Sequence, residues 1–188
     1  MQKQIIDIMK KHLAMLLIAV IPAVVGCTQN TTSDPQASEA QMDKPAVSLE
    51  KADYVWDGVK IEKTESEWKE QLTTMQFYVT RKEGTEPPFD NAFFDNHADG
   101  IYYCVCCGMP LFDAKTKFDS GTGWPSFYQP INDKNVASDV DYKIGYARDE
   151  VHCARCGAHL GHVFDDAPST PTGLRFCIDS AALIFQKR

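Results

Sequence analysis

The sequence has no long run of basic residues, and its formal net charge is −7. Nucleic acid is therefore excluded as a partner, because binding to phosphates requires a basic patch. A membrane-spanning helix needs roughly 20 apolar residues, and the uncharged apolar run at residues 13–25 has only 13. Long internal repeats are also absent. The composition is that of an ordinary globular protein, and 188 residues allow one domain with additional segments.

The chain has seven cysteines, an odd number that argues against a fully paired disulfide framework. They occupy positions 27, 104, 106, 107, 153, 156 and 177. Two CxxC pairs with additional isolated cysteines indicate metal ligands together with reactive thiols.

The N-terminus has the pattern of an export signal. Three lysines within the first eleven residues precede the apolar run, and a basic start with a short apolar core is typical of a secretory signal. The run ends Val24-Val25-Gly26-Cys27, which resembles a bacterial lipobox with Val24 in place of the commoner leucine. This resemblance predicts a signal peptide at residues 1–26 and a lipidated Cys27, whose several acyl chains hold the protein to a bilayer. A cleaved signal followed by an incidental cysteine is the alternative.

Residues 28–60 are mostly polar, with Pro35 and Pro45 among them. Such a segment buries too little apolar surface to offset its ordering entropy, so residues 27–60 are predicted to form a flexible tether that carries the lipidated cysteine. Its one apolar cluster is Tyr54-Val55-Trp56. The folded domain is predicted to cover residues 61–188.

The folded domain begins with a helix signal. Thr64 as the cap and Glu67 three residues later form a capping box, and Trp68 and Leu72 lie on one helical face. Beyond them, Gly, Pro, Asp and Asn separate short aromatic and β-branched runs, which predict strands at 77–79, 101–103, 144–146, 174–176 and 182–185. The pattern favours a mainly antiparallel β domain with a short helical lead-in.

Two CxxCG elements predict a metal site. Cys104 and Cys107 form the first, Cys153 and Cys156 the second, and a glycine follows each pair. In a zinc knuckle two thiolates bind from a tight turn that needs the freedom of glycine, and four thiolates close a tetrahedral structural site. Because Gly108 directly follows Cys107, we predict that Cys106 is not a ligand. Two disulfides and redox-active CxxC pairs are the alternatives.

Local sequence leaves the remaining candidates open. His159 and His162 follow the second knuckle and could be ordinary histidines or hydrogen-bonding groups that line a site. Cys177 belongs to no CxxC pair, and an isolated cysteine in an apolar run is more often buried and inert. Arg175 and the histidines would lower its pKa if they lay nearby.

Three long segments occur in a recognisable order. They are the glycine-rich FDSGTGWPSF at 118–127, CARCGAHLGHVF at 153–164 and PTGLRFCIDS at 171–180. Together they resemble the B-type methionine sulfoxide reductases from about residue 64 to 185, as do 84–89 and 100–104. The resemblance implies two antiparallel sheets (β-tent-like) with a helical lead-in and one structural zinc ion. It also implies that the chain reduces the R epimer of protein-bound methionine sulfoxide to methionine.

The resemblance also implies roles for individual residues. Cys177 would attack the sulfoxide sulfur as a thiolate and be left as a sulfenic acid. His159 and His162 would hold the sulfoxide oxygen and assist its protonation. Trp124 would receive the substrate methyl group, and Arg175 would favour the thiolate.

Two positions depart from the family pattern. Asp179 stands where the family commonly has asparagine, and an ionised acid there would repel a thiolate unless it were paired. Thr122 occupies the position at which many members have the resolving cysteine. We therefore expect an external thiol reductant, thioredoxin-like in kind, to attack the sulfenic acid directly. Cys106 or a zinc-ligand thiol is the alternative resolving group.

The predicted protein is thus an extracytoplasmic, membrane-anchored reductase that acts as a monomer on oxidised proteins. Two other classes remain as alternatives. A non-catalytic zinc-binding module would need the knuckles but not Cys177, His159 or His162. An exported thiol-disulfide oxidoreductase would need a solvent-facing CxxC pair without zinc.

Overall fold

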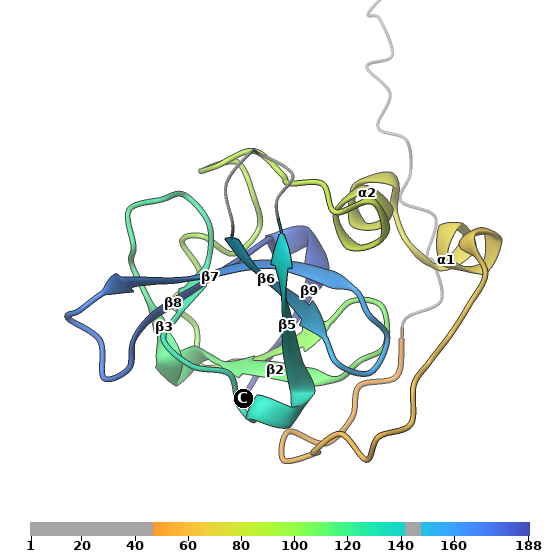
Figure 1. Ribbon diagram of the computed structural model, residues 1–188, viewed down its shortest axis with the longest axis horizontal. Helices are drawn as coiled ribbons and strands as arrows, with labels where there is room; N and C mark the ends of the chain where they lie inside the picture. The colour runs from red at the N-terminus through yellow and green to blue at the C-terminus, as the bar shows by residue number, and fades with distance from the viewer. Residues whose placement is uncertain (1–46, 142–147) are drawn as a thin grey trace, which may run out of the picture. The chain divides into compact units, whose positions relative to one another are not determined.

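The computed structural model describes residues 47–141 and 148–188 (Figure 1). Two α-helices in this part of the chain precede the strands. The helices are α1 (Glu65–Gln71) and α2 (Thr74–Lys82), and the 3-10 turns are η1 (Ala114–Thr116), η2 (Asp133–Asn135) and η3 (Ser180–Ala182). The strands are β1 (Gly100–Cys104), β2 (Pro110–Asp113), β3 (Lys117–Phe118), β4 (Ser126–Phe127), β5 (Val136–Asp141), β6 (Arg148–Cys153), β7 (His159–Ala167), β8 (Gly173–Ile178) and β9 (Leu183–Lys187).

The strands form two antiparallel sheets. The smaller has the order β2-β1-β9, and the larger has the order β3-β4-β8-β7-β6-β5. The prediction of a mainly β domain with two antiparallel sheets and a helical lead-in is therefore confirmed. Strand β8 lies between β4 and β7, so residues from three strands meet around its side chains.

Aromatic side chains join the two sheets. Tyr102 on β1 and Phe112 on β2 are fully buried against Phe127 on β4. The Phe112 and Phe127 rings stack at 4.5 Å, and the Tyr102 and Phe127 rings meet edge to face at 5.0 Å. Phe176 on β8 packs 5.9 Å from Phe112. Aromatic contacts thus fix the small sheet against the strands that carry the candidate site.

The two helices begin at matching signals. At α1, Thr64 and Glu67 form the predicted capping box, and both Trp68 and Leu72 are buried. The predicted strand at 77–79 is wrong, because these residues lie in α2. A second capping box, made by Thr73 and Gln76, begins that helix and outweighs the β propensity of the aromatic run.

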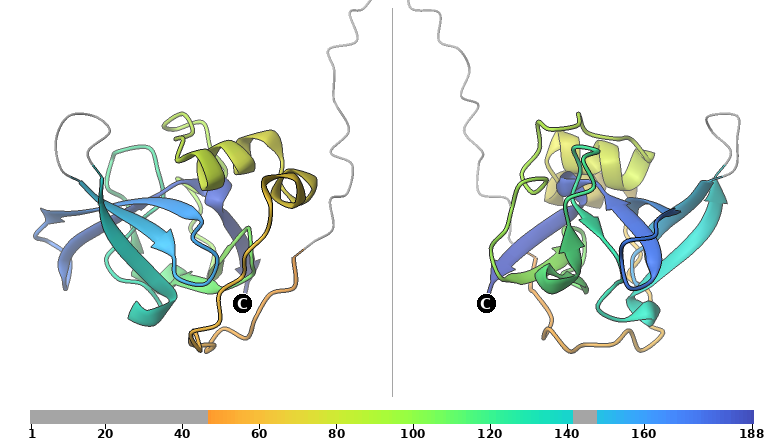
Figure 2. Two further views of the ribbon diagram at one scale, coloured as in Figure 1. Left: turned by 45° about the vertical axis from the view of Figure 1, so that its right-hand side comes forward. Right: turned by 90° about the vertical axis from the view of Figure 1, so that its left-hand side faces the viewer.

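The described part of the predicted tether packs on the domain. The Glu50 backbone N–H donates to the carbonyl oxygen of Gly108, and Tyr54 and Trp56 pack against the core. Figure 2 shows this orange segment passing the sheets before it reaches α1. Among residues 47–60, therefore, the chain is attached to the domain rather than free, because its aromatic side chains have apolar partners.

The remaining strand predictions have different outcomes. Those at 101–103, 174–176 and 182–185 are confirmed by β1, β8 and β9, although Ala182 belongs to η3. The prediction at 144–146, the signal peptide and Cys27 lie outside the described residues. No helix within the described ranges has the length and apolar character to cross a bilayer.

Candidate active site

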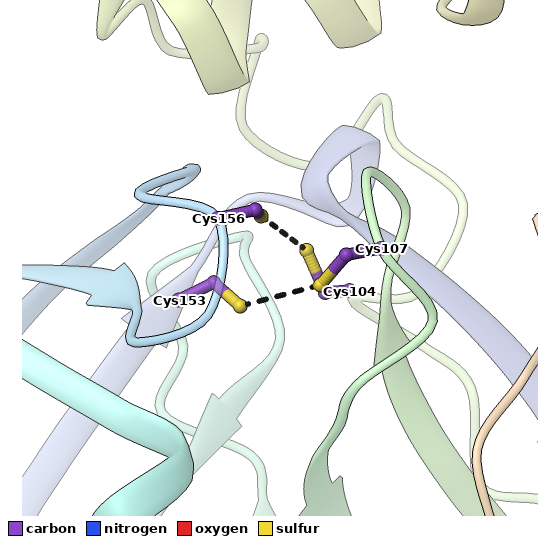
Figure 3. Close-up of side chains that lie close together, drawn as sticks. All are labelled: Cys104, Cys107, Cys153 and Cys156. Carbon is purple, nitrogen blue, oxygen red and sulfur yellow. Dashed lines mark hydrogen bonds between the residues drawn. The ribbon is translucent and has the colours of Figure 1, made fainter. Parts of the chain in front are cut away.

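Four cysteines from two distant loops converge at one point (Figure 3). Cys104 ends β1 and Cys107 lies in the β1–β2 connection, while Cys153 ends β6 and Cys156 lies in the β6–β7 connection. All four are buried, and their sulfur atoms lie within 4.8 Å of one another. The first knuckle follows a strand of the small sheet and the second a strand of the large sheet, so the cluster bridges the sheets.

The sulfur geometry fits a tetrahedral metal site. The Sγ atoms of Cys104 and Cys156 are 3.7 Å apart, and those of Cys107 and Cys153 are 3.6 Å apart. Four Zn–S bonds of about 2.3 Å in a tetrahedron place the sulfur atoms about 3.8 Å apart. A disulfide would bring them to about 2.05 Å. Four buried thiolates require a cation, because buried charges must be paired.

Each knuckle turns at its glycine, as the CxxCG pattern predicts. Gly108 and Gly157 have φ values of +72° and +64°. Their N–H groups donate to the carbonyl oxygens of Cys104 and Cys153 at 2.8 and 2.9 Å, which closes both turns. A side chain at either glycine would be strained in this left-handed conformation.

Cys106 lies outside the four-sulfur cluster, as predicted. It is buried, and its thiol interacts with Cys104, Cys156 and the Thr80 hydroxyl on α2. None of these partners is among the groups that surround Cys177. The two thiols therefore lie in different environments.

Cys177 lies on β8 between β4 and β7. Its pairing partners are Ser126 on β4 and His162 on β7, so the three side chains share one face of the sheet. The Thr122 hydroxyl oxygen lies 3.9 Å from the Cys177 Sγ. Cys177 is only half-buried. It is also a free cysteine, with no disulfide to another cysteine.

The two histidines lie beside each other because β7 is bulged. Residues three apart on a regular strand face opposite sides of the sheet, but the register shifts between Val151 and His152 of the facing strand. The ring centroids of His159 and His162 are consequently 5.4 Å apart. The arrangement brings both rings to the Cys177 side of the sheet.

Glycine is needed at position 161, where β7 pairs closely with β8. Its φ is +147°, and a Cβ there would lie 2.0 Å from the Cys177 carbonyl oxygen. We expect Gly161→Ala to lower the free energy of unfolding by about 2–3 kcal/mol. Because β8 must move, we also expect the rate of a reaction at Cys177 to fall about 10²-fold.

Urea unfolding and single-turnover kinetics would measure these two effects. The matched control is Gly173→Ala at the start of β8, where φ is +74° and a Cβ meets nothing within 4 Å. Backbone strain is common to the two variants, but only Gly161→Ala has the clash. Equal losses of activity in both variants would contradict a specific role for the close approach of β7 to β8 at Gly161.

Glu150 on β6 is a site residue that the sequence analysis missed. Its Oε1 lies 2.6 Å from the Nδ1 of His159, which is 3 % exposed. This contact fixes the ring orientation of His159 and favours a proton on Nδ1. Glu150 also pairs with His162 across the sheet. No local sequence signal marks it, because only the strand register brings it to the histidines.

Glu86 connects the Trp124 loop to η3, the turn that follows β8. Its carbonyl oxygen accepts a hydrogen bond from the Trp124 indole at 3.1 Å. Its buried carboxylate accepts bonds from the backbone N–H groups of Ser180 and Ala181, the latter at 2.9 Å. Trp124 is half-buried, and the next residue, Pro125, accepts a hydrogen bond from Ile178. The sequence analysis also missed Glu86. The signal that could have found it is a carboxylate within residues 84–89, which resemble the family named above.

Arg175 lies two residues before Cys177, and strand alternation therefore places it on the same face. It forms a two-point ion pair with Asp166 at 2.8 and 2.7 Å, and its guanidinium lies 4.4 Å from the Phe164 ring centroid. Burial raises the pKa of the Cys177 thiol, while the Arg175 charge and the Thr122 hydroxyl lower it. Burial outweighs them, so the net shift is upward.

Asp179 is buried close to Cys177 and Glu86. Its Oδ1 accepts a hydrogen bond from the Glu86 backbone N–H at 3.1 Å. Burial, reinforced by the Glu86 charge, raises the pKa of Asp179 to about 7. Near pH 7 the acid is therefore populated in both protonation states, and its ionised form raises the pKa of the Cys177 thiol.

Replacing Asp179 with asparagine, which keeps the oxygen that accepts from Glu86, should stabilise the protein above neutral pH. A raised folded pKa means that the wild type loses stability as pH rises from about 4 to 7. The variant avoids this loss, so its advantage should grow over that range to about 2–4 kcal/mol and then level off. Urea unfolding at pH 4.5 and pH 8 measures it, with wild type at each pH as the reference. A pH-independent difference would contradict the prediction.

The predicted site residues therefore lie together in two groups. The cysteine cluster forms one, and the other contains His159, His162, Trp124, Arg175, Cys177 and Asp179 around the centre of the large sheet. Thr122 lies in contact with Cys177.

Comparison with known proteins agrees with this geometry. The SelR domain matches residues 72–187. A Pseudomonas putida protein named peptide methionine sulfoxide reductase MsrB is 54% identical over 129 residues, which cover 69% of this chain and 98% of that relative. A Hahella chejuensis protein of the same name is 48% identical, with 67% and 90% covered. The chloroplastic peptide methionine sulfoxide reductase B1 of Arabidopsis thaliana is 56% identical, with 64% and 59% covered. This chain therefore belongs to the SelR family, among whose members are these peptide methionine sulfoxide reductases.

Proposed function

We propose that this protein reduces the R epimer of methionine sulfoxide in proteins to methionine, with Cys177 as the nucleophile. The observation that carries the proposal is the position of Cys177. It is half-buried at the centre of the large sheet, beside His162 and within 3.9 Å of the Thr122 hydroxyl. Membership of the SelR family and the names of the relatives give the substrate class.

In the first step the Cys177 thiolate attacks the sulfoxide sulfur, and the sulfoxide oxygen is transferred to Cys177 with uptake of a proton. Methionine leaves, and Cys177 becomes a sulfenic acid. The sulfoxide gains two electrons and the cysteine loses them. Because burial raises the pKa of the Cys177 thiol, Arg175 and Thr122 assist by favouring the charged form.

The oxygen must be protonated as it leaves the methionine sulfur, and the histidines are placed to help. His162 lies opposite Cys177 across the strand pair, and His159 lies beside it with its Nδ1 held by Glu150. A histidine exchanges protons near neutral pH, which suits general acid catalysis. Trp124 offers an apolar face for the substrate methyl group.

The sulfenic acid is returned to a thiol by an external reductant. Two thiol groups of the reductant form a disulfide, and one water molecule is released. Thr122 cannot form a disulfide, and Cys106 is buried among partners that Cys177 does not share. The direct external route is therefore favoured over a resolving cysteine within the described residues.

Zinc is the metal proposed for the four-cysteine cluster. Bound there, it would hold the two knuckles together as a structural ion and take no part in the reaction. The sulfur separations and the burial of all four cysteines support this assignment. The same burial disfavours a thiol-disulfide oxidoreductase, which needs a solvent-facing CxxC pair.

The experiment that tests the function is single-turnover reduction of a peptide that contains either the R or the S epimer of methionine sulfoxide. We expect one equivalent of methionine from the R epimer and none from the S epimer. Reduction of neither epimer by fully reduced, metal-loaded protein would leave a non-catalytic metal-binding module as the better description.

We also propose export and anchoring through a lipidated Cys27, with a thioredoxin-like carrier as the reductant and a monomer as the active form. The support is the basic and apolar pattern of residues 1–27 and the lipobox resemblance. Incorporation of labelled palmitate in wild type but not in Cys27→Ser would support the anchor. Unlabelled, fully released protein would contradict it.

A further inference from the structure

Phe89 combines exposure with an unusual backbone conformation. Its side chain is 59% exposed, and its φ is +61°, in the left-handed region. A bulky residue in this region is a true outlier, and such strain persists only where surrounding contacts enforce it. Strained residues also concentrate at functional sites.

The contacts that enforce this conformation join Phe89 to the Trp124 loop. The Phe89 backbone N–H donates to the Gly123 carbonyl oxygen at 2.9 Å, and the Asn91 side chain donates to the same oxygen at 2.7 Å. The ring packs against Gly123 so closely that a Cβ there would lie 2.8 Å from a ring carbon of Phe89.

Gly123 lies between two residues of the candidate site. Thr122, on one side, is 3.9 Å from the Cys177 sulfur, and Trp124, on the other, is the proposed wall for the substrate methyl group. Phe89 therefore lies at the edge of the site rather than elsewhere on the surface.

The loop that carries Phe89 is also attached to η3, the turn that follows the Cys177 strand β8. The Ser180 hydroxyl donates to Asn91 at 2.7 Å and accepts from the Phe93 backbone at 3.1 Å. The Phe94 ring supports Phe89 edge to face at 5.9 Å. Pro87 and Pro88 are exposed beside Phe89. These contacts hold an apolar edge, made of residues 87–89, in a fixed position next to the site.

We propose that Phe89 binds the polypeptide that flanks the methionine sulfoxide, and that it selects substrates with apolar neighbouring residues. This inference rests on the proposed function and adds a specificity-determining residue to it. An exposed ring held rigidly beside a site binds at low entropic cost, because little freedom remains to be lost. A partner with apolar side chains matches its chemistry, whereas the sulfoxide itself is held by Trp124 and the histidines.

The test compares two substrates of the R epimer. One is a pentapeptide with leucine on both sides of the sulfoxide, and the other is N-acetyl-methionine-R-sulfoxide methylamide, which has no flanking side chains. Phe89→Asn removes the ring but keeps a residue that tolerates the left-handed conformation. We expect kcat/KM for the pentapeptide to fall roughly fivefold more than for the small substrate, through KM.

Two further variants sharpen the comparison. Phe89→Tyr keeps the ring and should therefore retain the wild-type preference for the pentapeptide. Met75→Ala removes a similarly exposed apolar side chain (44%) from α2 and should leave the ratio of the two substrates as in wild type. An equal change for both substrates, or none for the pentapeptide, would overturn the inference. If wild type reduces neither substrate, the proposed function itself fails.

Discussion

Cys177→Ser is expected to lower the single-turnover rate of methionine-R-sulfoxide reduction about 10⁴-fold or more. A serine hydroxyl is a far weaker nucleophile than a thiolate, and it cannot take up the sulfoxide oxygen as a sulfenic acid. The substitution is nearly isosteric at a half-buried position, so the fold should remain intact. Rapid-quench analysis of methionine formation measures the rate.

A second measurement identifies the intermediate. Wild type treated with one equivalent of the R sulfoxide and then dimedone should acquire one adduct, located on Cys177. The matched control is Cys106→Ser, which should retain both the adduct and multiple turnover with dithiothreitol. Loss of turnover in Cys106→Ser would show that this buried thiol resolves the sulfenic acid, contrary to the direct route. Full activity of Cys177→Ser would exclude the proposed nucleophile.

Cys107→Ser is expected to abolish metal binding and leave the domain unfolded at 37 °C. The four sulfur atoms are buried within 4.8 Å of one another, and the ion that they bind would be the main link between the knuckles. Structural zinc contributes an apparent binding free energy of about 10–16 kcal/mol in small domains. A domain typically has only about 5–15 kcal/mol of stability in total, so its loss should not be tolerated.

The neighbouring residue again supplies the control, because Cys106 is equally buried but lies outside the cluster. Elemental analysis should give one zinc ion per chain for wild type and Cys106→Ser, and none for Cys107→Ser. Circular dichroism should show a cooperative thermal transition only in the first two. A folded, metal-free Cys107→Ser protein would show that the cluster is dispensable for the fold.

Short local patterns predicted those parts of the protein that local rules determine. The capping box at Thr64 begins α1, and the glycines after Cys107 and Cys156 close the two knuckles as expected. The predicted strand at 77–79 was wrong for a local reason, because the capping box of Thr73 and Gln76 begins a helix there. In these cases neighbouring residues in the sequence are also neighbours in space.

The candidate site depends on contacts that no local pattern contains. Glu150 meets His159 only through the register of β6 and β7, and the bulge in that register places His159 beside His162. The attachment of residues 47–60 was missed for a related reason. Tyr54 and Trp56 are too few to predict burial by themselves, and their partners lie far along the chain. Cys177 was identifiable only through family resemblance.

The four-cysteine cluster joins two segments that are far apart in the chain. A metal ion bound to Cys107 and Cys153 closes a loop spanning 46 residues. Closing such a loop removes about 4 kcal/mol of chain entropy from the unfolded state. The loop contains Thr122, Trp124 and Glu150, whereas Cys177 lies beyond it. Metal binding would therefore restrict the part of the unfolded chain that carries Thr122, Trp124 and Glu150, whereas the segment with the histidines and Cys177 would keep its freedom until β7 and β8 pair.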